Sequence, residues 1–398
     1  MGYYITKATI MSLFTGKSSI LVTCAREIPH YLSAEITSMG LPLVSAFTAG
    51  VETEGTLEEA MKLNLLIRTG HRVLYLITEL TAHDADELYR GISEIPWEQY
   101  ISKTGYFTVT SFVDNPTIRD SRFANVKCKD AIADRFLKMF DMRPDSGPER
   151  REVVLYLYWL KNRCSVYLDT SGEPLSRRGY RKIPLAAPMQ ETLAASVILA
   201  SGWHGDENFV NPMCGSGTLA IEAALIALDR APGLLRNNFG FMHIPDFKKS
   251  AWTKLRNMTN RKSKKQLSGK IIASDINPWA VDAARKNAQT AGVEHLVEFS
   301  VSDYSDTPIP EGTGVIMINP AYGERMGEID HLKETYRGIG DFLKGKCSGY
   351  RGYIFTGNLA LAKQVGLKTK RRIPFYNSNI ECRLLEYELY EGSRKNGE

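Results

Sequence analysis

The chain has 398 residues, of which 43% are hydrophobic and 24% are charged. That length exceeds one ordinary hydrophobic core, so we expect a globular protein of two or three domains. The sequence has no run of about eighteen uncharged apolar residues, and its start lacks the charged-then-apolar order of a secretory signal. We therefore expect neither membrane insertion nor secretion, and a cytoplasmic location.

Charge and cysteine usage narrow the classes of protein further. Lys and Arg number 50 and Asp and Glu 45, so the net charge of +5 alone indicates little about partners. Basic residues gather in three runs, 176–182, 261–265 and 368–372, each suited either to nucleic-acid phosphate or to a solvated surface. The six cysteines form no C-x-x-C pair and no cluster with histidine, so we expect reduced thiols and no metal.

The first half of the chain is built from short segments in which β-branched and aromatic residues dominate. These segments predict strands at 19–24, 72–77, 107–113 and 153–159. A helix is predicted over 120–140, because apolar residues recur there at the spacing i, i+4, i+7, i+8. Those residues are Ile132, Phe136, Met139 and Phe140. We expect an α+β arrangement with helices packed on one face of a small sheet.

The character of the sequence changes after Tyr167. The stretch 169–188 is dense in Gly, Pro and basic residues, which is typical of a hinge or a functional loop. Beyond it helix and strand patterns alternate, which predicts an α/β doubly wound sheet. The expected helices cover 190–200, 218–228 and 278–291. One expected strand ends at Val210, and the others cover 270–274, 297–301, 314–318 and 352–356.

A glycine-containing loop, N-P-M-C-G-S-G-T at 211–218, lies between a predicted strand and a predicted helix. Gly215 and Gly217 permit a tight turn and a close approach to a ligand, and the helix start offers unpaired N–H groups. The loop has neither G-x-G-x-x-G nor G-K-[ST], which phosphate-binding loops require. It therefore predicts S-adenosylmethionine, which has no phosphate, as the cofactor. The contact residues expected here are Asn211, Pro212, Gly215, Ser216 and Gly217.

Asp275 ends the next predicted strand, where an acidic residue grips ribose hydroxyls in doubly wound folds. Its neighbours Ile276 and Asn277 are expected to contact the cofactor with it. The alternative for Asp275 is an N-cap ahead of Pro278. Asp275 lies beyond the usual distance of about 20 residues from the glycines. We attribute this distance to an insertion over 233–269, between the first helix and the second strand.

Ser302 and Asp303 follow the third predicted strand. A group that contacts the adenine amine belongs at this place in a doubly wound fold. Capping of the local loop is the competing interpretation of Asp303. We expect both residues to contact the cofactor.

A candidate reactive loop, N-P-A-Y-G-E-R at 319–325, follows the fourth strand. An aryl amine is a poor nucleophile while its lone pair is delocalised into the ring. The side-chain oxygen of Asn319 and the carbonyl of Pro320 are two acceptors that would hold the amine hydrogens and favour a pyramidal nitrogen. Tyr322 would stack on a base turned out of its helix. The alternative is an ordinary turn after a strand, where N-P is common.

Three motifs in order, at 178–181 with 187–194, at 211–218 and at 319–325, resemble the THUMP-containing guanine 2-amino methyltransferases of 23S ribosomal RNA. The resemblance runs from about Ser19 to nearly the end of the chain. It implies four parts, which are a ferredoxin-like region at 1–64, a THUMP RNA-binding domain at 65–168, an approach loop at 169–188 and a Rossmann-like class I methyltransferase domain at 189–398.

The resemblance also implies roles for particular residues. Positions matching Gln190 and Thr192 lie near the cofactor in that family, and its N-P-P-Y tetrapeptide is catalytic, which points to Asn319, Pro320 and Tyr322. This sequence departs from the family at Ala321, where a second proline is usual. Proline fixes its own φ and restricts the residue before it, and alanine does neither. The loop should therefore be less rigid, so we expect methyl transfer to be slower but not abolished.

The approach loop is the candidate RNA contact, through Arg177, Arg178, Tyr180 and Arg181. We expect it to guide the target nucleotide into the pocket. Removing its charges should weaken RNA binding and leave cofactor binding unchanged. The expected partner is structured RNA, either 23S ribosomal RNA or a preribosomal particle.

Three alternatives are weighed against this function. A tRNA guanosine 2-amino methyltransferase would share the THUMP module and the reactive loop. A DNA adenine methyltransferase shares the N-P-P-Y chemistry, but the RNA-binding resemblance of the first half opposes it. A non-catalytic RNA-binding or ribosome-assembly factor would have lost its active loop, with Ala321 as the trace, although the other expected site residues are retained.

Overall fold

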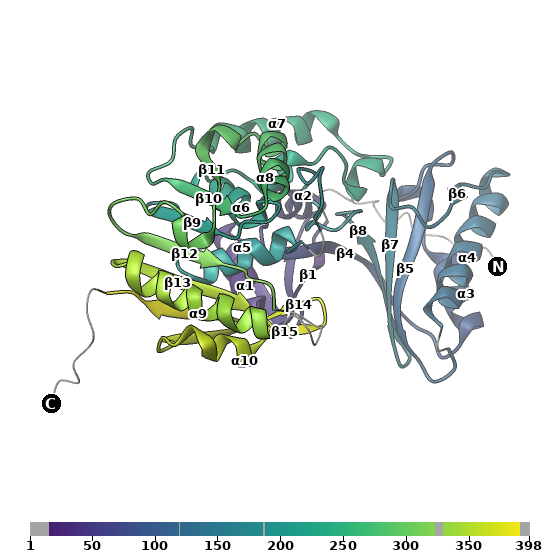
Figure 1. The fold of residues 1–398 in the computed structure, drawn as a ribbon. Helices are drawn as coiled ribbons and strands as arrows, with labels where there is room; N and C mark the ends of the chain where they lie inside the picture. Colours follow the sequence, from purple (N-terminus) through teal and green to yellow (C-terminus); the bar gives the residue numbers. More distant parts are fainter. Residues whose placement is uncertain (1–15, 119, 186–187, 323–328, 391–398) are drawn as a thin grey trace, which may run out of the picture. The chain divides into compact units, whose positions relative to one another are not determined.

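The structure is a computed structural model that describes residues 16–118, 120–185, 188–322 and 329–390. The chain forms two compact units (Figure 1). The first unit comprises Met1–Cys24, Ser33–Leu175 and Arg236–Asn257, and the second comprises Ala25–Leu32, Ser176–Leu235 and Met258–Glu398. Within the described ranges, no helix has both the length and the apolar character that crossing a membrane requires.

The first unit is organised around an eight-stranded sheet with the order β2-β3-β1-β4-β8-β7-β5-β6. Neighbouring strands are antiparallel except β5, which runs parallel to β6 and β7. The pairing of β1 with β4 joins the two regions predicted at 1–64 and 65–168 in one sheet. The strands are β1 (Ser18–Cys24), β2 (Leu43–Phe47), β3 (Gly50–Gly55), β4 (Gly70–Thr81), β5 (Tyr106–Asp114), β6 (Asp145–Ser146), β7 (Val153–Leu160) and β8 (Arg163–Asp169).

Side-chain caps mark where helices of this unit begin. Thr56 and Glu59 form a capping box on α2, and Asp84 and Asp120 accept hydrogen bonds from the first turns of α3 and α4. Helices α3 and α4 pack against each other, and α4 packs on β5. The helices named in this part of the chain are α1 (Pro29–Ser38), α2 (Leu57–Leu66), α3 (Ala85–Glu94) and α4 (Ser121–Phe140).

The predicted apolar stripe of α4 is correct in part. Ile132 and Phe136 are fully buried, as expected. Met139 is 49% exposed, so its assignment to the stripe was wrong. Phe140 is half-buried, and its ring centroid lies 5.7 Å from that of Phe136.

The second unit contains a seven-stranded sheet with the order β11-β10-β9-β12-β13-β15-β14. The first five strands are parallel, and β15 is antiparallel to β13 and β14. The predicted doubly wound α/β sheet is confirmed. The strands are β9 (Asn208–Pro212), β10 (Ile271–Asp275), β11 (Val297–Val301), β12 (Gly314–Ile318), β13 (Tyr350–Thr356), β14 (Arg371–Asn377) and β15 (Ile380–Glu388).

Helices cover both faces of this sheet, which is why its strands are apolar on both sides. Val210, Ile272 and Ile316 belong to one core cluster with Tyr336 and Phe342 of α9. Their strand neighbours point to the opposite face and are buried too. The remaining helices are α5 (Glu191–Ala200), α6 (Thr218–Ala227), α7 (Lys249–Lys262), α8 (Pro278–Ala291), α9 (Ile329–Lys346) and α10 (Leu359–Ala362).

The insertion predicted over 233–269 adds no strand to the seven-stranded sheet. Its first part, Arg236–Asn257, belongs to the first unit. There the Arg236 guanidinium donates to the carbonyls of Ser171 and Pro174, at 2.9 and 3.0 Å. Short 3-10 turns at Pro232–Leu235 and Gly240–His243 precede α7.

Candidate active site

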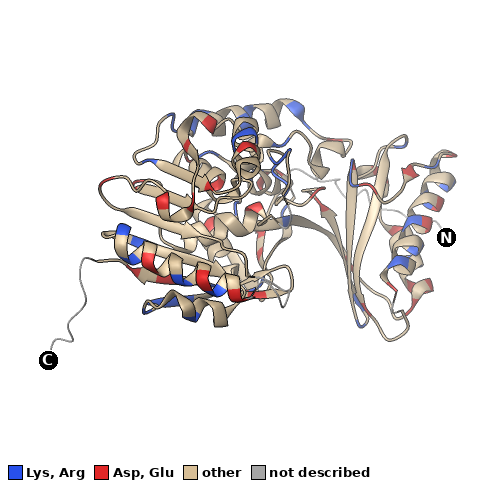
Figure 2. Ribbon diagram, viewed as in Figure 1, with Lys and Arg blue, Asp and Glu red and all other residues tan. Residues whose placement is uncertain are grey.

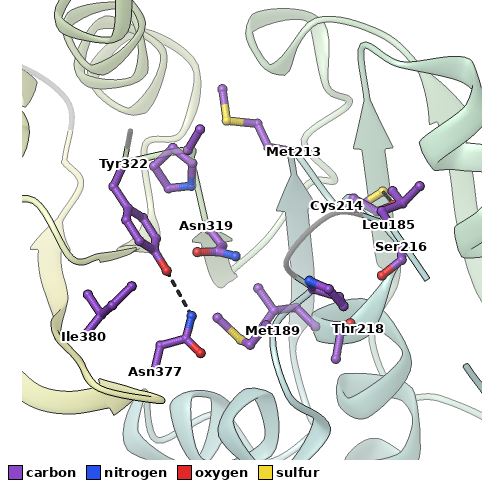
Figure 3. A pocket seen from close by; sticks show the side chains of 15 residues that line it. Leu185, Met189, Met213, Cys214, Ser216, Thr218, Asn319, Tyr322, Asn377 and Ile380 are labelled. Carbon is purple, nitrogen blue, oxygen red and sulfur yellow. Dashed lines mark hydrogen bonds between the residues drawn. The ribbon is translucent and has the colours of Figure 1, made fainter. Parts of the chain in front are cut away.

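The topology of the second unit brings two loops together. In an open parallel sheet, ligands bind where adjacent connections leave in opposite directions, beyond the carboxyl ends of the strands. Strands β9 and β12 are neighbours at this point, and the glycine loop and the reactive loop follow them. A cavity of about 480 Å³ lies between the loops. Figure 3 shows Tyr322 and Asn377 on one side of it, Ser216 and Thr218 on the other, and Asn319 between them.

The glycine loop requires both of its glycines, for different reasons. Gly215 and Gly217 have φ values of +54° and +83°, in the left-handed region that side chains disfavour. A Cβ on Gly217 would lie 2.8 Å from the Cβ of Ala284 in α8, whereas a Cβ on Gly215 would meet nothing within 4 Å. Gly217 therefore permits close packing, and Gly215 leaves the backbone open toward the cavity.

Asp275 is tied to the glycine loop. One carboxylate oxygen accepts from the backbone N–H of Gly215 at 2.9 Å, and the other accepts from that of Asn277 at 3.0 Å. The N-cap of α8 is Asn277, whose side chain accepts from Trp279 N at 3.0 Å. The alternative interpretation of Asp275 as that N-cap was wrong. The neighbouring Ile276 is 69% exposed, an apolar surface beside the carboxylate.

Asp303 caps the short turn Tyr304–Asp306 by accepting from Ser305 N at 2.9 Å. The capping role that competed with cofactor contact is therefore present. It uses one carboxylate oxygen of Asp303, and it does not prevent the other from accepting a hydrogen bond from an adenine amine.

Four predicted site residues carry a buried polar atom that has no hydrogen-bond partner among the described residues. They are Oγ1 of Thr192, Oδ1 of Asn211, Oγ of Ser302 and Oδ1 of Asn319. An unsatisfied buried polar group costs about 1–3 kcal/mol, and a ligand that hydrogen-bonds to the group would offset this cost. Their chemistry, hydroxyl and amide oxygens around a glycine loop, fits the polar groups of S-adenosylmethionine.

The expected contacts Gln190 and Asn211 differ in burial. Gln190 is the N-cap residue of α5, is exposed and makes no side-chain cap hydrogen bond. Asn211 is fully buried, and its side-chain nitrogen donates to the carbonyl of Met317 at 2.9 Å. This bond links strands β9 and β12 directly behind the cavity.

Tyr322 of the reactive loop is held by residues that the sequence analysis did not predict. Asn377 Nδ2 donates to the Tyr322 hydroxyl at 3.0 Å, and Asn358 Nδ2 donates to the Tyr322 carbonyl at 3.4 Å. The ring lies against Gly357, where an added Cβ would be 3.3 Å from two ring carbons and 2.9 Å from Ile380. The ring orientation is therefore fixed by the end of β13 and the β14–β15 hairpin.

Parts of two sequence motifs lie outside the described residues. These are Gly323, Glu324 and Arg325 of the reactive loop and Ala187 of the approach loop. Within the described part of the reactive loop, Pro320 is buried and Ala321 is exposed. The position where this chain departs from the resembled family is therefore exposed, and it lines the cavity.

Two of the four candidate RNA contacts point into the protein. Arg178 and Tyr180 are each 1% exposed. The Arg178 guanidinium lies 3.4 Å from a carboxylate oxygen of Glu222 in α6, and the Tyr180 hydroxyl donates to the same carboxylate at 3.1 Å. Burial and the nearby carboxylate raise the pKa of Tyr180 well above its usual value. Both side chains therefore anchor the approach loop on α6.

Arg181 connects the approach loop to the glycine loop. Its guanidinium donates to Glu191 at 3.2 Å, to the Ser216 hydroxyl at 3.2 Å and to the Met189 carbonyl at 2.8 Å. The side chain of Arg181 is only 13% exposed. Burial raises the pKa of Glu191, and Arg181 opposes that rise. Arg177, in contrast, is exposed.

Asn287 of α8 approaches the same loop from the other side. Its side-chain nitrogen donates to the Ser216 carbonyl at 3.2 Å and to the Ile183 carbonyl at 3.1 Å, and its oxygen accepts from Lys182 N at 2.9 Å. Ser216 is thus held through its hydroxyl by Arg181 and through its carbonyl by Asn287.

The sheet order, the glycine loop and the unpartnered oxygens define a Rossmann-like methyltransferase domain. The family described as "RMKL-like, methyltransferase domain" matches residues 178–386, the THUMP domain matches 82–169, and the RlmL ferredoxin-like domain matches 19–74. The chain belongs to the RMKL-like methyltransferase family, preceded by ferredoxin-like and THUMP domains.

Several relatives are similar over most of this chain. Ribosomal RNA large subunit methyltransferase K/L of Syntrophotalea carbinolica is 37% identical over 93% of this chain and 53% of its own. "Putative RNA methyltransferase slr0064" of Synechocystis is 33% identical over 92% and 96%. The crystal structure of "SMU.472, a putative methyltransferase complexed with SAH" matches with a TM-score of 0.85 and 27% identity over 95% and 99%. The chain spans about half the length of the K/L relatives it matches.

Proposed function

We propose that this protein transfers a methyl group from S-adenosylmethionine to the exocyclic 2-amino group of a guanosine in 23S ribosomal RNA. The observation that carries the proposal is the buried, unpartnered side-chain oxygen of Asn319, which lines the cavity between the glycine loop and the reactive loop. The names of the K/L relatives support ribosomal RNA as the substrate, and the complex of SMU.472 with SAH supports the cofactor.

S-adenosylmethionine supplies, when bound, a methyl group on a positively charged sulfur. We assign its binding to Gln190, Thr192 and the glycine loop, with Asp275, Ile276 and Asn277 at the ribose and Ser302 and Asp303 at the adenine. Asp275 suits this role because a ribose hydroxyl is a donor that its carboxylate can accept. Ile276 offers the apolar surface that an adenine ring requires.

Asn319 decides which nitrogen is methylated. Its buried side-chain oxygen has no partner in the described part of the chain and accepts hydrogens, as does the Pro320 carbonyl. An exocyclic amine offers two hydrogens to these acceptors, whereas the ring nitrogen N7 of guanine has none. The site therefore favours N2 over N7. Tyr322, already fixed by Asn377, would stack on the extruded base.

The proposed substrate is structured RNA, either free 23S ribosomal RNA or a preribosomal particle in the cytoplasm. The THUMP domain supports RNA as the partner class. Among the proposed loop contacts, Arg177 is exposed and suited to phosphate, whereas the burial of Arg178 and Tyr180 favours an anchoring role. A tRNA guanosine remains the second candidate, because the same loop chemistry would serve it. The chemistry assigned to these residues requires no metal.

Calorimetric titration with S-adenosylhomocysteine, combined with methyl transfer to bulk RNA, tests this proposal. We expect Asn319→Ala to bind the product like the wild type but to lose about a hundredfold in turnover, because a group that orients the reacting atom is removed. A folded wild-type protein that binds no S-adenosylhomocysteine would contradict the cofactor assignment. Unchanged turnover of Asn319→Ala would contradict the role of the reactive loop.

A further inference from the structure

The insertion between α6 and β10 carries an unusual concentration of positive charge. Residues 248–265 contain eight Lys or Arg and no Asp or Glu. The other 380 residues contain 42 Lys and Arg and 45 Asp and Glu, so the net positive charge of the whole chain comes from this one segment. Helix α7 (Lys249–Lys262) forms most of it.

Most cations of this segment are exposed. Seven of them are exposed, and none of these seven forms an ion pair with a described residue. The seven are Lys248, Lys249, Lys254, Arg261, Lys262, Lys264 and Lys265. Helix α9 is different, because its Lys333 pairs with Asp330 at 2.8 Å. In Figure 2, α9 shows red and blue residues in alternation, whereas α7 carries only blue ones.

The helix is anchored so that its charges face outward. Trp252 is 4% exposed and packs edge-on against Phe239 and Phe241, with ring centroids 5.5 and 5.0 Å apart. Lys254 and Arg261 are seven residues apart, which is two turns and about 10.5 Å along the axis, on the side of the helix opposite Trp252. An aromatic anchor thus fixes a row of cations toward solvent.

The seven-stranded sheet does not require this segment. The insertion adds no strand, and β10 pairs with β9 and β11 in regular parallel register without it. Like charges along one helix repel each other, which lowers helix stability by a few tenths of a kcal/mol per pair. A polyanion bound along the helix would remove this repulsion.

We propose that α7 and its flanking lysines form a second RNA-binding surface, which contacts backbone phosphates of the substrate RNA away from the target base. The proposal rests on the proposed function, because it takes the substrate to be RNA. Lysine-rich cationic surfaces bind phosphates by releasing condensed counterions and do not read base sequence. The surface therefore adds affinity and orientation, while the cavity selects the nucleotide.

The test compares two full-length variants with equal loss of charge. The α7 variant is Lys254→Gln/Arg261→Gln/Lys262→Gln/Lys264→Gln, and the matched α9 control is Lys333→Gln/Arg337→Gln/Lys344→Gln/Lys346→Gln. Binding to a protein-free 23S ribosomal RNA transcript is measured between 50 and 200 mM salt. We expect the Kd of the α7 variant to rise about tenfold or more and its log Kd–log salt slope to fall by about three, at 0.7–0.9 per lost contact. Binding of S-adenosylhomocysteine should not change in either variant.

Each other outcome overturns the inference in an identifiable way. Wild-type RNA affinity in the α7 variant would overturn it and leave the proposed function intact. An equal loss in the α9 control would attribute the effect to overall charge. Loss of binding to phosphatidylserine vesicles without loss of RNA binding would indicate a membrane partner. A wild-type protein that binds S-adenosylhomocysteine but no RNA would overturn both the inference and the proposed substrate.

Discussion

Ala321 occupies a position in the reactive loop where the resembled family has proline. Ala321 is exposed and directly follows the buried Pro320, so a proline at 321 would have room. Proline at a compatible site stabilises the ordered loop by about 0.4–1 kcal/mol, chiefly through lost chain entropy. We expect Ala321→Pro to raise the rate of methyl transfer about two- to fivefold under single-turnover conditions. An unchanged rate would contradict the view that this loop lacks rigidity.

A substitution of Arg181 distinguishes a role in cofactor binding from a role in RNA binding. Its guanidinium contacts Glu191, Ser216 and the Met189 carbonyl together, a geometry that a lysine ammonium cannot reproduce. We expect Arg181→Lys to weaken S-adenosylhomocysteine binding about tenfold by calorimetry, because the brace on the glycine loop is lost. RNA affinity should stay unchanged. Weaker RNA binding with unchanged S-adenosylhomocysteine binding would instead assign Arg181 to the RNA contacts.

The types of residue at the site were predictable, but their pairings were not. Asn211 and Asn319 stand in local motifs, so their places toward the carboxyl ends of the neighbouring strands β9 and β12 followed from chain position. The burial of Arg178 and Tyr180 depends on Glu222, more than forty residues later, which no local pattern indicates. Only the packing of the approach loop on α6 distinguishes an anchoring arginine from one that binds RNA.

At the scale of elements, the glycine loop and α8 are built as one unit. Gly217→Ala would force a left-handed residue and place its Cβ 2.8 Å from Ala284, whereas Gly215→Ala adds only the backbone strain. We expect denaturant unfolding to show a loss of about 1–2 kcal/mol for Gly215→Ala and at least 1–3 kcal/mol more for Gly217→Ala. Equal losses would contradict the close contact between the loop and α8.

Elements with strong local signals were predicted best. The helix expected at 278–291 is observed over Pro278–Ala291, because Asn277 caps it, Pro278 suits its first turn, and Gly292 ends it with φ +69°. The strands at 297–301 and 314–318 also match. The β14–β15 hairpin was not predicted, although N-S-N at 377–379 between two strand-like runs is a turn signal. Because the hairpin was not predicted, the role of Asn377 in holding Tyr322 was not predicted either.

At the scale of the whole molecule, each compact unit is built from segments that are not continuous in the sequence. The insertion before β10 contributes Arg236–Asn257 to the first unit, although it lies within the sequence of the methyltransferase domain. The sequence pattern indicated an insertion but not the unit to which it belongs. That depends on contacts such as the hydrogen bond from Arg236 to the Ser171 carbonyl. The charge concentration of α7 was likewise visible in the sequence as a basic run, without its anchoring.

All six cysteines are buried and unpaired. Burial raises the pKa of Cys24, Cys164 and Cys347 to about 12, so at pH 8 almost none of these thiols is ionised. We expect fewer than one thiol per native chain to react rapidly with a disulfide reagent, and all six after denaturation. Because the folded pKa values lie above the unfolded value of about 8.5, these thiols favour folding below that pH. The free energy of unfolding should therefore fall as the pH rises from 9 toward 12.

The central claim is tested most directly by giving the protein labelled S-adenosylmethionine with a mixture of unmodified large ribosomal RNA and tRNA, followed by nucleoside analysis. We predict label in 2-methylguanosine from the large ribosomal RNA, appearing about a hundredfold more slowly in an Asn319→Ala reaction run beside it. Label in 7-methylguanosine or in tRNA alone would contradict the assignment of the reactive loop to the 2-amino group of a ribosomal guanosine.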